Sequence, residues 1–140
     1  MKREDAEPFL RERNRGTLIT LRRDGRAQSS NIAYVYGDDA ARISVTADRA
    51  KTKNLARDGR AVLHVSSDDL WQYVSADGVA EISSVTTEPG DAVGVELGEI
   101  YEAVAGEAHP DWDEFYEAMV SEARVVITFR PSSFAGAVSR

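Results

Sequence analysis

Residues 17–36, TLITLRRDGRAQSSNIAYVY, form the stretch that decides the fold. The aliphatic and β-branched run at 17–21 is typical of a strand, and a second extended run covers 27–36. Asp24-Gly25 lies between them, and this dipeptide favours the tight turn of a β-hairpin because glycine adopts positive φ angles at no steric cost. The stretch therefore predicts two neighbouring antiparallel strands.

Later segments also have the composition of strands: residues 42–47, 61–65, 71–84 and 125–129. Asp77-Gly78 interrupts the third of these segments and predicts a bulge or a tight bend within one long strand. The last segment is apolar on both faces, so we expect a helix, a barrel interior or another subunit to cover each face.

Helices are predicted in four places: a short one around residues 8–10 that ends near Gly16, one bracketed by Asp48 and Gly59, and two amphipathic ones over 91–105 and 111–120. Six antiparallel strands joined largely by hairpins, with these helices at the periphery, predict the α+β class. We expect a small closed or split β-barrel that forms one domain over residues 1–140.

The composition excludes several classes of chemistry. The chain has no cysteine, and its two histidines, His64 and His109, are too far apart in sequence to form a local ligand pair, so we expect neither a thiolate nucleophile nor a metal site. A mean hydropathy of −0.39 and a charged start argue against a membrane span and a secretory signal. We therefore expect a cytoplasmic protein with no membrane partner.

The net charge of −7 is unevenly distributed along the chain. Residues 22–60 carry nine Lys or Arg against five Asp or Glu, whereas residues 61–123 carry fifteen Asp or Glu and no Lys or Arg. A nucleic-acid binder needs a broad basic face rather than one basic segment in an acidic chain. A compact anionic ligand is the better prediction.

The basic segment places Arg49, Lys51 and Lys53 near the start of the helix predicted after Asp48. A helix start already carries unpaired N–H groups and the positive end of the helix dipole, so added cations are unfavourable there unless an anion offsets them. One interpretation is a site for a phosphate or carboxylate. The other is a basic helix face exposed to water.

Polar and aromatic residues on two predicted strands are further candidates for a binding site. Gln28-Ser29-Ser30-Asn31 puts small polar groups on both faces of a strand, which suits either the heteroatoms of a flat ring or a water-exposed edge. Trp71 and Tyr73, spaced to face the same way, suit either stacking on a planar ligand or a core. His64 has the chemistry of a proton donor, but a lone strand histidine is more often structural.

Three segments taken together, residues 24–31, 49–55 and 71–80, resemble the pyridoxamine 5′-phosphate oxidase-like split-barrel family. Within it, the chain is most similar to the actinobacterial flavin/deazaflavin oxidoreductases of the B group, which use the deazaflavin coenzyme F420. The resemblance covers nearly the whole chain. It implies a six-stranded antiparallel split barrel of the FMN-binding type and a homodimer that binds its cofactor in a groove between subunits.

By matching position, the resemblance also implies roles for individual residues. Arg49, Lys51 and Thr52 would hold the cofactor's phosphate and acidic tail. Gln28, Ser30 and Asn31 would line the ring, and Trp71 with Tyr73 would close the groove from the other subunit. The cofactor-binding residues expected in this way are Gln28, Ser30, Asn31, Arg49, Ala50, Lys51, Thr52, Asn54, Trp71 and Tyr73.

The implied activity is hydride transfer from reduced F420 to a small unsaturated or aromatic substrate, for which no side-chain nucleophile is needed. The completing proton would come from solvent, Tyr34, Tyr36 or His64. Two alternatives remain at this point. One is an FMN-dependent oxidase or reductase, because the two cofactors share a tricyclic ring and a phosphate, and the other is a non-catalytic carrier of F420, flavin or haem.

Overall fold

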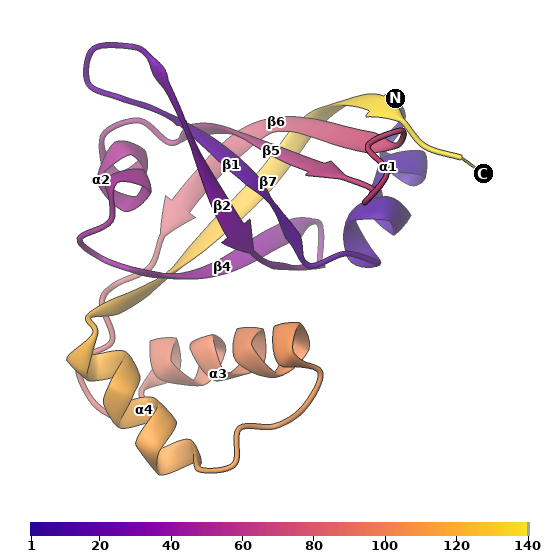
Figure 1. Ribbon diagram of the computed structural model, residues 1–140. Coiled ribbons are helices and arrows are strands. Elements are labelled where there is room, and N and C mark those ends of the chain that lie inside the picture. The colour runs from indigo at the N-terminus through magenta and orange to yellow at the C-terminus, as the bar shows by residue number, and fades with distance from the viewer. Residues whose placement is uncertain (140) are drawn as a thin grey trace.

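The computed structural model describes residues 1–139 (Figure 1). Its elements, in chain order, are α1 (Arg3–Arg11), β1 (Arg15–Leu21), β2 (Ala27–Ala33), β3 (Val35–Gly37), β4 (Ala40–Thr46), α2 (Ala50–Arg57), β5 (Arg60–Ser66), β6 (Tyr73–Ile82), α3 (Ala92–Ala105), α4 (Trp112–Ser121) and β7 (Arg124–Ala137). The predicted α+β class is confirmed.

The strands form one curled antiparallel sheet in the order β2-β1-β5-β6-β7-β4-β3. The predicted hairpin joins β1 and β2, with Leu21 opposite Ala27 and Gly25 at a φ of 89° in the turn. As Figure 1 shows, α1 and α2 lie toward opposite ends of the curled sheet, and α3 and α4 form a separate layer next to β4. This is the split-barrel arrangement.

The strand predicted over 27–36 is divided into β2 and β3, so the sheet has seven strands rather than six. The division falls at Tyr34, which is fully buried and whose backbone N–H donates to the Asn14 carbonyl instead of to a strand partner. β2 and β3 form the two edges of the sheet. Tyr34 therefore carries the chain from one edge to the other, and this brings the edges together into a barrel.

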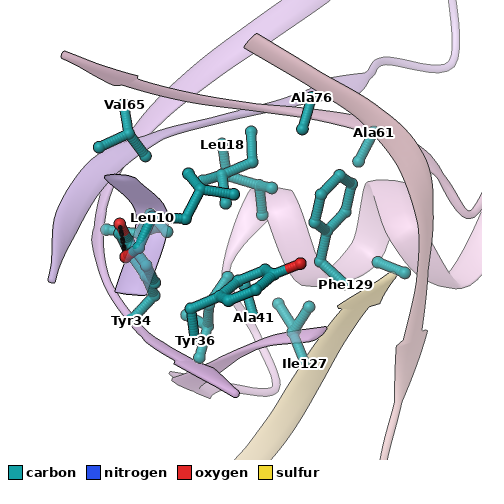
Figure 2. Packing of buried hydrophobic residues seen from close by; sticks show 14 of the residues in the cluster. Leu10, Leu18, Tyr34, Tyr36, Ala41, Ala61, Val65, Ala76, Ile127 and Phe129 are labelled. Atoms are coloured by element: carbon teal, nitrogen blue, oxygen red, sulfur yellow. Dashed lines mark hydrogen bonds between the residues drawn. The ribbon is translucent and has the colours of Figure 1, made fainter. Parts of the chain in front are cut away.

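Two apolar cores lie on opposite sides of β7. In the first half of β7, Val125, Ile127 and Phe129 point into the barrel interior, where they pack with Leu10, Leu18 and other residues (Figure 2). Val126 points the other way, into a cluster with residues of α3 and α4. The expectation that both faces of this strand are covered is confirmed, and the chain itself supplies the barrel interior and the helices that cover them.

The structure also confirms the bulge in β6, where the register with β7 shifts between Asp77 and Gly78. A Cβ at Gly78 would collide with the Arg130 carbonyl group, so only glycine allows β7 to approach so closely.

The helix predicted between Asp48 and Gly59 is confirmed as α2, whereas the prediction that α1 ends near Gly16 is wrong, and neither glycine has the positive φ of a glycine C-cap. Gly16 lies inside β1, because α1 already ends at Arg11, and an added Cβ would come within 2.8 Å of the His64 carbonyl oxygen. Gly59 follows α2, which ends in an extended Asp58 C-cap, and its added Cβ would lie 3.0 Å from the Ala80 carbonyl oxygen. Both glycines serve close strand packing rather than helix termination.

Candidate functional site

A cavity of about 360 Å³ lies where the end of β2, the strand β4 and the helical layer meet. Its strand side includes Asn31 and Ser44. Its helical side is formed by apolar and aromatic residues: Leu97, Ile100, Tyr101, Val104, Phe115 and Met119. The charged residues that line it are Lys51 and Arg124. A largely apolar cavity with a few converging polar groups is the usual form of a small-molecule site.

The start of α2 lies beside this cavity and lacks an internal cap. Arg49 is the N-cap residue, its side chain makes no capping hydrogen bond, and the first turn contains no acidic residue. Asp48, which was expected to begin this helix, instead accepts from the Thr46 hydroxyl at 2.7 Å. By contrast, Asp91 and Asp111 cap α3 and α4 with their carboxylates. Within residues 1–139, neither an N-cap side chain nor a first-turn carboxylate satisfies the first N–H groups of α2, which makes them suitable donors to an external acceptor.

Positive charge gathers at the same place. Lys51 is half-buried at the cavity wall, and its pKa is lowered by burial first and then by the positive charges of Arg49 and Arg124. Cations that destabilise one another in this way gain from a bound anion. Lys53 is exposed on the same helix and does not line the cavity.

Arg124 is the site residue that the sequence predictions missed. The pairing of β4 with β7 sets it opposite Thr46, close to the start of α2. Its Nη2 donates to Glu122 at 3.1 Å and its Nη1 to Ser44 at 3.4 Å, but its Nε is buried and has no partner among residues 1–139. The signal in the sequence that could have identified it is that Arg124 is the first Lys or Arg after Arg60.

Among the ten residues predicted to bind the cofactor, Asn31 and Lys51 line the cavity. Arg49 and Ala50 are exposed at the adjacent helix start. Thr52 is buried, and its hydroxyl donates to the Thr46 carbonyl at 2.9 Å, so it fixes the start of the helix from within.

Gln28 and Asn54 contact each other rather than the cavity. The Asn54 amide nitrogen donates to Gln28 Oε1 and to the Thr20 hydroxyl, each at 3.1 Å. The burial of β2 alternates, so Gln28 and Ser30 lie on the barrel side of the strand and Asn31 on its outer side. The polar residues of this strand are therefore divided between an internal network and the site.

Trp71 and Tyr73 do not share a strand, and neither lines the cavity. Trp71 lies in the turn before β6 and is 81% exposed. Its backbone N–H donates to the Asp69 carboxylate, which also accepts a hydrogen bond from the Ser67 hydroxyl. Tyr73 begins β6, and its ring lies 5.4 Å from that of His64.

An open groove of about 600 Å³ runs across β1, β2 and β5 on the outer face of the sheet. Both His64 and Asn31 line it, and Asn31 also lines the cavity. The groove and the cavity are thus neighbours that share one residue.

Two of the three side chains considered as proton donors lie inside the barrel. The Tyr34 hydroxyl donates to the Leu10 carbonyl at 2.8 Å, and the Tyr36 hydroxyl donates to Glu7 at 2.9 Å. Burial raises the pKa of both hydroxyls, which also makes them poor acids. The expectation that Tyr34 or Tyr36 supplies a proton is therefore wrong, and His64 is the remaining side-chain candidate.

A curled antiparallel sheet whose edges meet beside a helical layer defines a split β-barrel protein. Residues 3–136 match the family described as pyridoxamine 5′-phosphate oxidase, and the chain belongs to that family. The resemblance inferred from residues 24–31, 49–55 and 71–80 is thereby confirmed at the level of the family.

Solved structures share the fold at low identity. A protein described as an F420 reductase is 24% identical, with a TM-score of 0.68 over 93% of this chain and 95% of that one. A conserved hypothetical protein of Mycobacterium tuberculosis is 23% identical, with a TM-score of 0.77 over 97% and 84%. The haem storage protein of Vibrio cholerae is 16% identical, with a TM-score of 0.65 over 92% and 89%.

Two further observations concern residues 1–139. No helix in this range is long and apolar enough to cross a membrane. Nor do three or more His, Cys, Asp or Glu side chains of this range gather as a metal ion would require.

Proposed function

We propose that the protein is an F420-dependent reductase that acts on a small unsaturated or aromatic substrate. The observation that carries this proposal is the uncapped start of α2, with Arg49 and Lys51 beside a cavity that is otherwise apolar. The residues fit an anionic cofactor because backbone N–H groups and cations there have no anion of the chain's own in the first turn. When bound, reduced F420 supplies a hydride, and a proton from solvent or from His64 completes the reduction of a C=C or C=N bond.

The role of the chain in this proposal is to bind and to orient. Lys51, Arg49 and the first-turn N–H groups of α2 hold the anionic part of the cofactor. Asn31 and Ser44 offer an amide and a hydroxyl to its ring from the strand side of the cavity. Thr52 and Asn54 hold α2 in place through their internal hydrogen bonds.

We infer F420 rather than FMN from where the cations lie. Lys51 is at the cavity wall, while Arg49 and Lys53 extend the positive surface outward from it. F420 carries a longer anionic tail than FMN, so it makes use of cations outside the cavity. The F420 reductase among the similar structures supports this inference at the level of the fold.

We also infer that two copies of the chain assemble. Leu70 and Trp71 are 74% and 81% exposed at the tip of a turn held by its own hydrogen bonds, and Val79 is 54% exposed on β6. Large apolar side chains held rigidly in water favour an interface. In such a dimer Trp71 and Tyr73 are placed to close the partner's groove.

The test is a titration of the purified protein with F420 and with FMN, followed by fluorescence. We expect tighter binding of F420, and Lys51→Ala should weaken it by about 1–3 kcal/mol through loss of a charge-assisted contact. Lys53→Ala is the matched control, since Lys53 has the same charge on the same helix but lies away from the cavity, and its effect should be smaller. Preference for FMN would favour the alternative cofactor, and indifference to Lys51 would contradict the site.

A second measurement separates an enzyme from a carrier. Reduced F420 is mixed with the protein and a panel of conjugated enones, and oxidation of the cofactor is followed by absorbance. We expect protein-dependent oxidation with at least one acceptor. Tight binding of F420 with no transfer to any acceptor would indicate a storage or carrier protein.

A further inference from the structure

The helical side of the cavity differs from its strand side. Leu97, Ile100 and Val104 of α3 and Phe115 and Met119 of α4 face it with hydrocarbon and ring surfaces. A ring rich in heteroatoms would leave its polar atoms without partners on this side, at a cost in desolvation. The helical side is therefore suited to the apolar body of a second molecule.

The charged residues that line the cavity are both positive, although Glu122 pairs with one of them, Arg124, at 3.1 Å. No Asp or Glu among residues 1–139 lines it, although α3 and α4 are strongly acidic. Glu96 and Glu99 lie on the face of α3 that contacts Arg42, at 3.7 and 3.3 Å from its guanidinium. An acidic layer thus covers a cavity whose charged residues, Lys51 and Arg124, are both positive.

The Arg124 guanidinium has an N–H group that no described residue pairs with. Glu122 and Ser44 occupy its two terminal nitrogens, while the buried Nε–H has no acceptor among the described residues. Buried N–H groups of native proteins are nearly always satisfied by protein, ordered water or a bound group, so an unpaired one on a side chain that lines the cavity leaves Arg124 able to bind a further acceptor. Because the guanidinium is charged, an anionic oxygen such as that of a carboxylate is the acceptor that gains most from this N–H.

We propose that the substrate is a small, largely apolar molecule that carries one carboxylate, which Arg124 binds while the apolar body lies against α3 and α4. The substrate role rests on the proposed function, since it requires the cofactor ring to lie on the strand side, near Asn31 and Ser44. The carboxylate itself is bound and not transformed. Arg124 is then a specificity-determining residue that borders the cofactor site, since its Nη1 donates to Ser44.

The test uses a matched pair of probes without any cofactor. 2-Naphthoate and 2-naphthamide have the same bicyclic body, but only the former is charged, and calorimetry measures the affinity of the protein for each. We expect naphthoate to bind about 10- to 100-fold more tightly, the range for a charge-assisted hydrogen bond. Arg124→Gln should abolish this difference, whereas Arg130→Gln, on an exposed residue of the same strand, should leave it intact.

A second pair of variants tests the place of binding. Ala105 is an exposed residue of α3 that lines the cavity, and Ala103 is exposed on the same helix but does not line it. Ala105→Phe should weaken both probes by a similar factor, because it fills the space, and Ala103→Phe should not. These substitutions on exposed positions keep the test valid even if Arg124→Gln folds poorly.

The outcomes separate the two proposals. Equal affinities for the two probes, a difference that survives in Arg124→Gln, or loss of naphthoate binding when F420 saturates the protein would each overturn the carboxylate pocket. If neither F420 nor FMN binds while naphthoate discriminates as expected, the proposed function fails and the substrate role fails with it, but the anion-binding cavity stands. If F420 binds and naphthoate does not, the proposed function stands and the carboxylate pocket is overturned.

Discussion

The starts of α2 and α3 meet the same physical requirement in opposite ways. At α3, the Asp91 carboxylate accepts hydrogen bonds from Gly94, Thr86, Thr87 and Glu88. These bonds hold the pKa of Asp91 well below its usual range, and those from the Gly94 N–H and the Thr86 hydroxyl contribute most. At α2 no side chain caps the helix, and cations occupy the first turn. The first arrangement is complete within the chain, and the second is the one that we propose is completed by an external anion.

This difference shows how stability and binding are divided between the two helices. A capped helix start stabilises the fold whether or not a ligand is present. An uncapped, cationic start destabilises the free protein slightly and gains its favourable interactions only on binding. The comparison predicts that substitutions at the two starts have opposite effects on stability.

The largest expected effect on stability is that of Asp91→Ala. It removes the acceptor for four donors around α3, and the melting temperature should fall by about 3–8 °C. Differential scanning calorimetry measures it. Asp91→Ser is the control because serine retains a capping oxygen, and it should recover part of the loss; a melting temperature equal to that of the unmodified protein in Asp91→Ala would contradict the asymmetry.

The second effect is opposite in sign. Arg49→Asp supplies a capping acceptor to α2 and removes a cation from its first turn, so the free protein should gain about 1 kcal/mol in its free energy of unfolding. The same change should weaken F420 binding at least as much as Lys51→Ala does. Urea unfolding and the fluorescence titration measure the two quantities. If Arg49→Asp neither stabilises the free protein nor weakens F420 binding, the uncapped start of α2 is not an anion-binding site.

A third, smaller effect concerns pH. Because the pKa of Lys51 is lowered, the ammonium group loses its proton at a lower pH than an ordinary lysine does. Affinity for F420 should therefore be constant at neutral pH and decline in the alkaline range, at a lower pH than the titration of an ordinary lysine would give. In Lys51→Arg the decline should be absent, since arginine stays protonated in this range. A pH profile shared by both proteins would assign the decline to another group.

The smallest effect is the loss, at low pH, of the stability that the Asp91 carboxylate contributes. A carboxylate whose folded pKa is depressed stabilises the protein above its unfolded pKa of about 3.9, and the contribution is lost as pH falls through the folded value. The gap in melting temperature between the unmodified protein and Asp91→Ala should thus narrow below about pH 4. Scans at pH 7, 4 and 2.5 measure this narrowing; a constant gap would mean that the cap acts independently of its charge.

Local signals in the sequence predicted much of the fold. Asp24-Gly25 defined the first hairpin, Asp77-Gly78 the bulge, and Asp91 and Asp111 the starts of α3 and α4, because each acts through its immediate backbone neighbours. The division at Tyr34 was not predictable in this way. It depends on where the sheet must curl, which is set by the burial of Tyr34 among residues distant in sequence.

The residues of the candidate site also differ in whether local sequence could predict them. Lys51 was found because its charge and its helix start are adjacent in sequence. Arg124 was missed because only the β4–β7 register brings it near Lys51. Gln28 was assigned to the ligand from its polarity and from the family resemblance, neither of which indicates that its hydrogen-bond partner, Asn54, comes from another element.

The position of β7 has a consequence for synthesis on the ribosome. It is the last strand along the chain, yet it lies between β6 and β4 in the sheet. Until residues 124–137 have left the exit tunnel, the β2-β1-β5-β6 half and the β4-β3 hairpin have no strand to join them. From the emergence of β6 until that point, the nascent protein exposes two unpaired strand edges, and this is the period in which it is most open to chaperones and to misassembly.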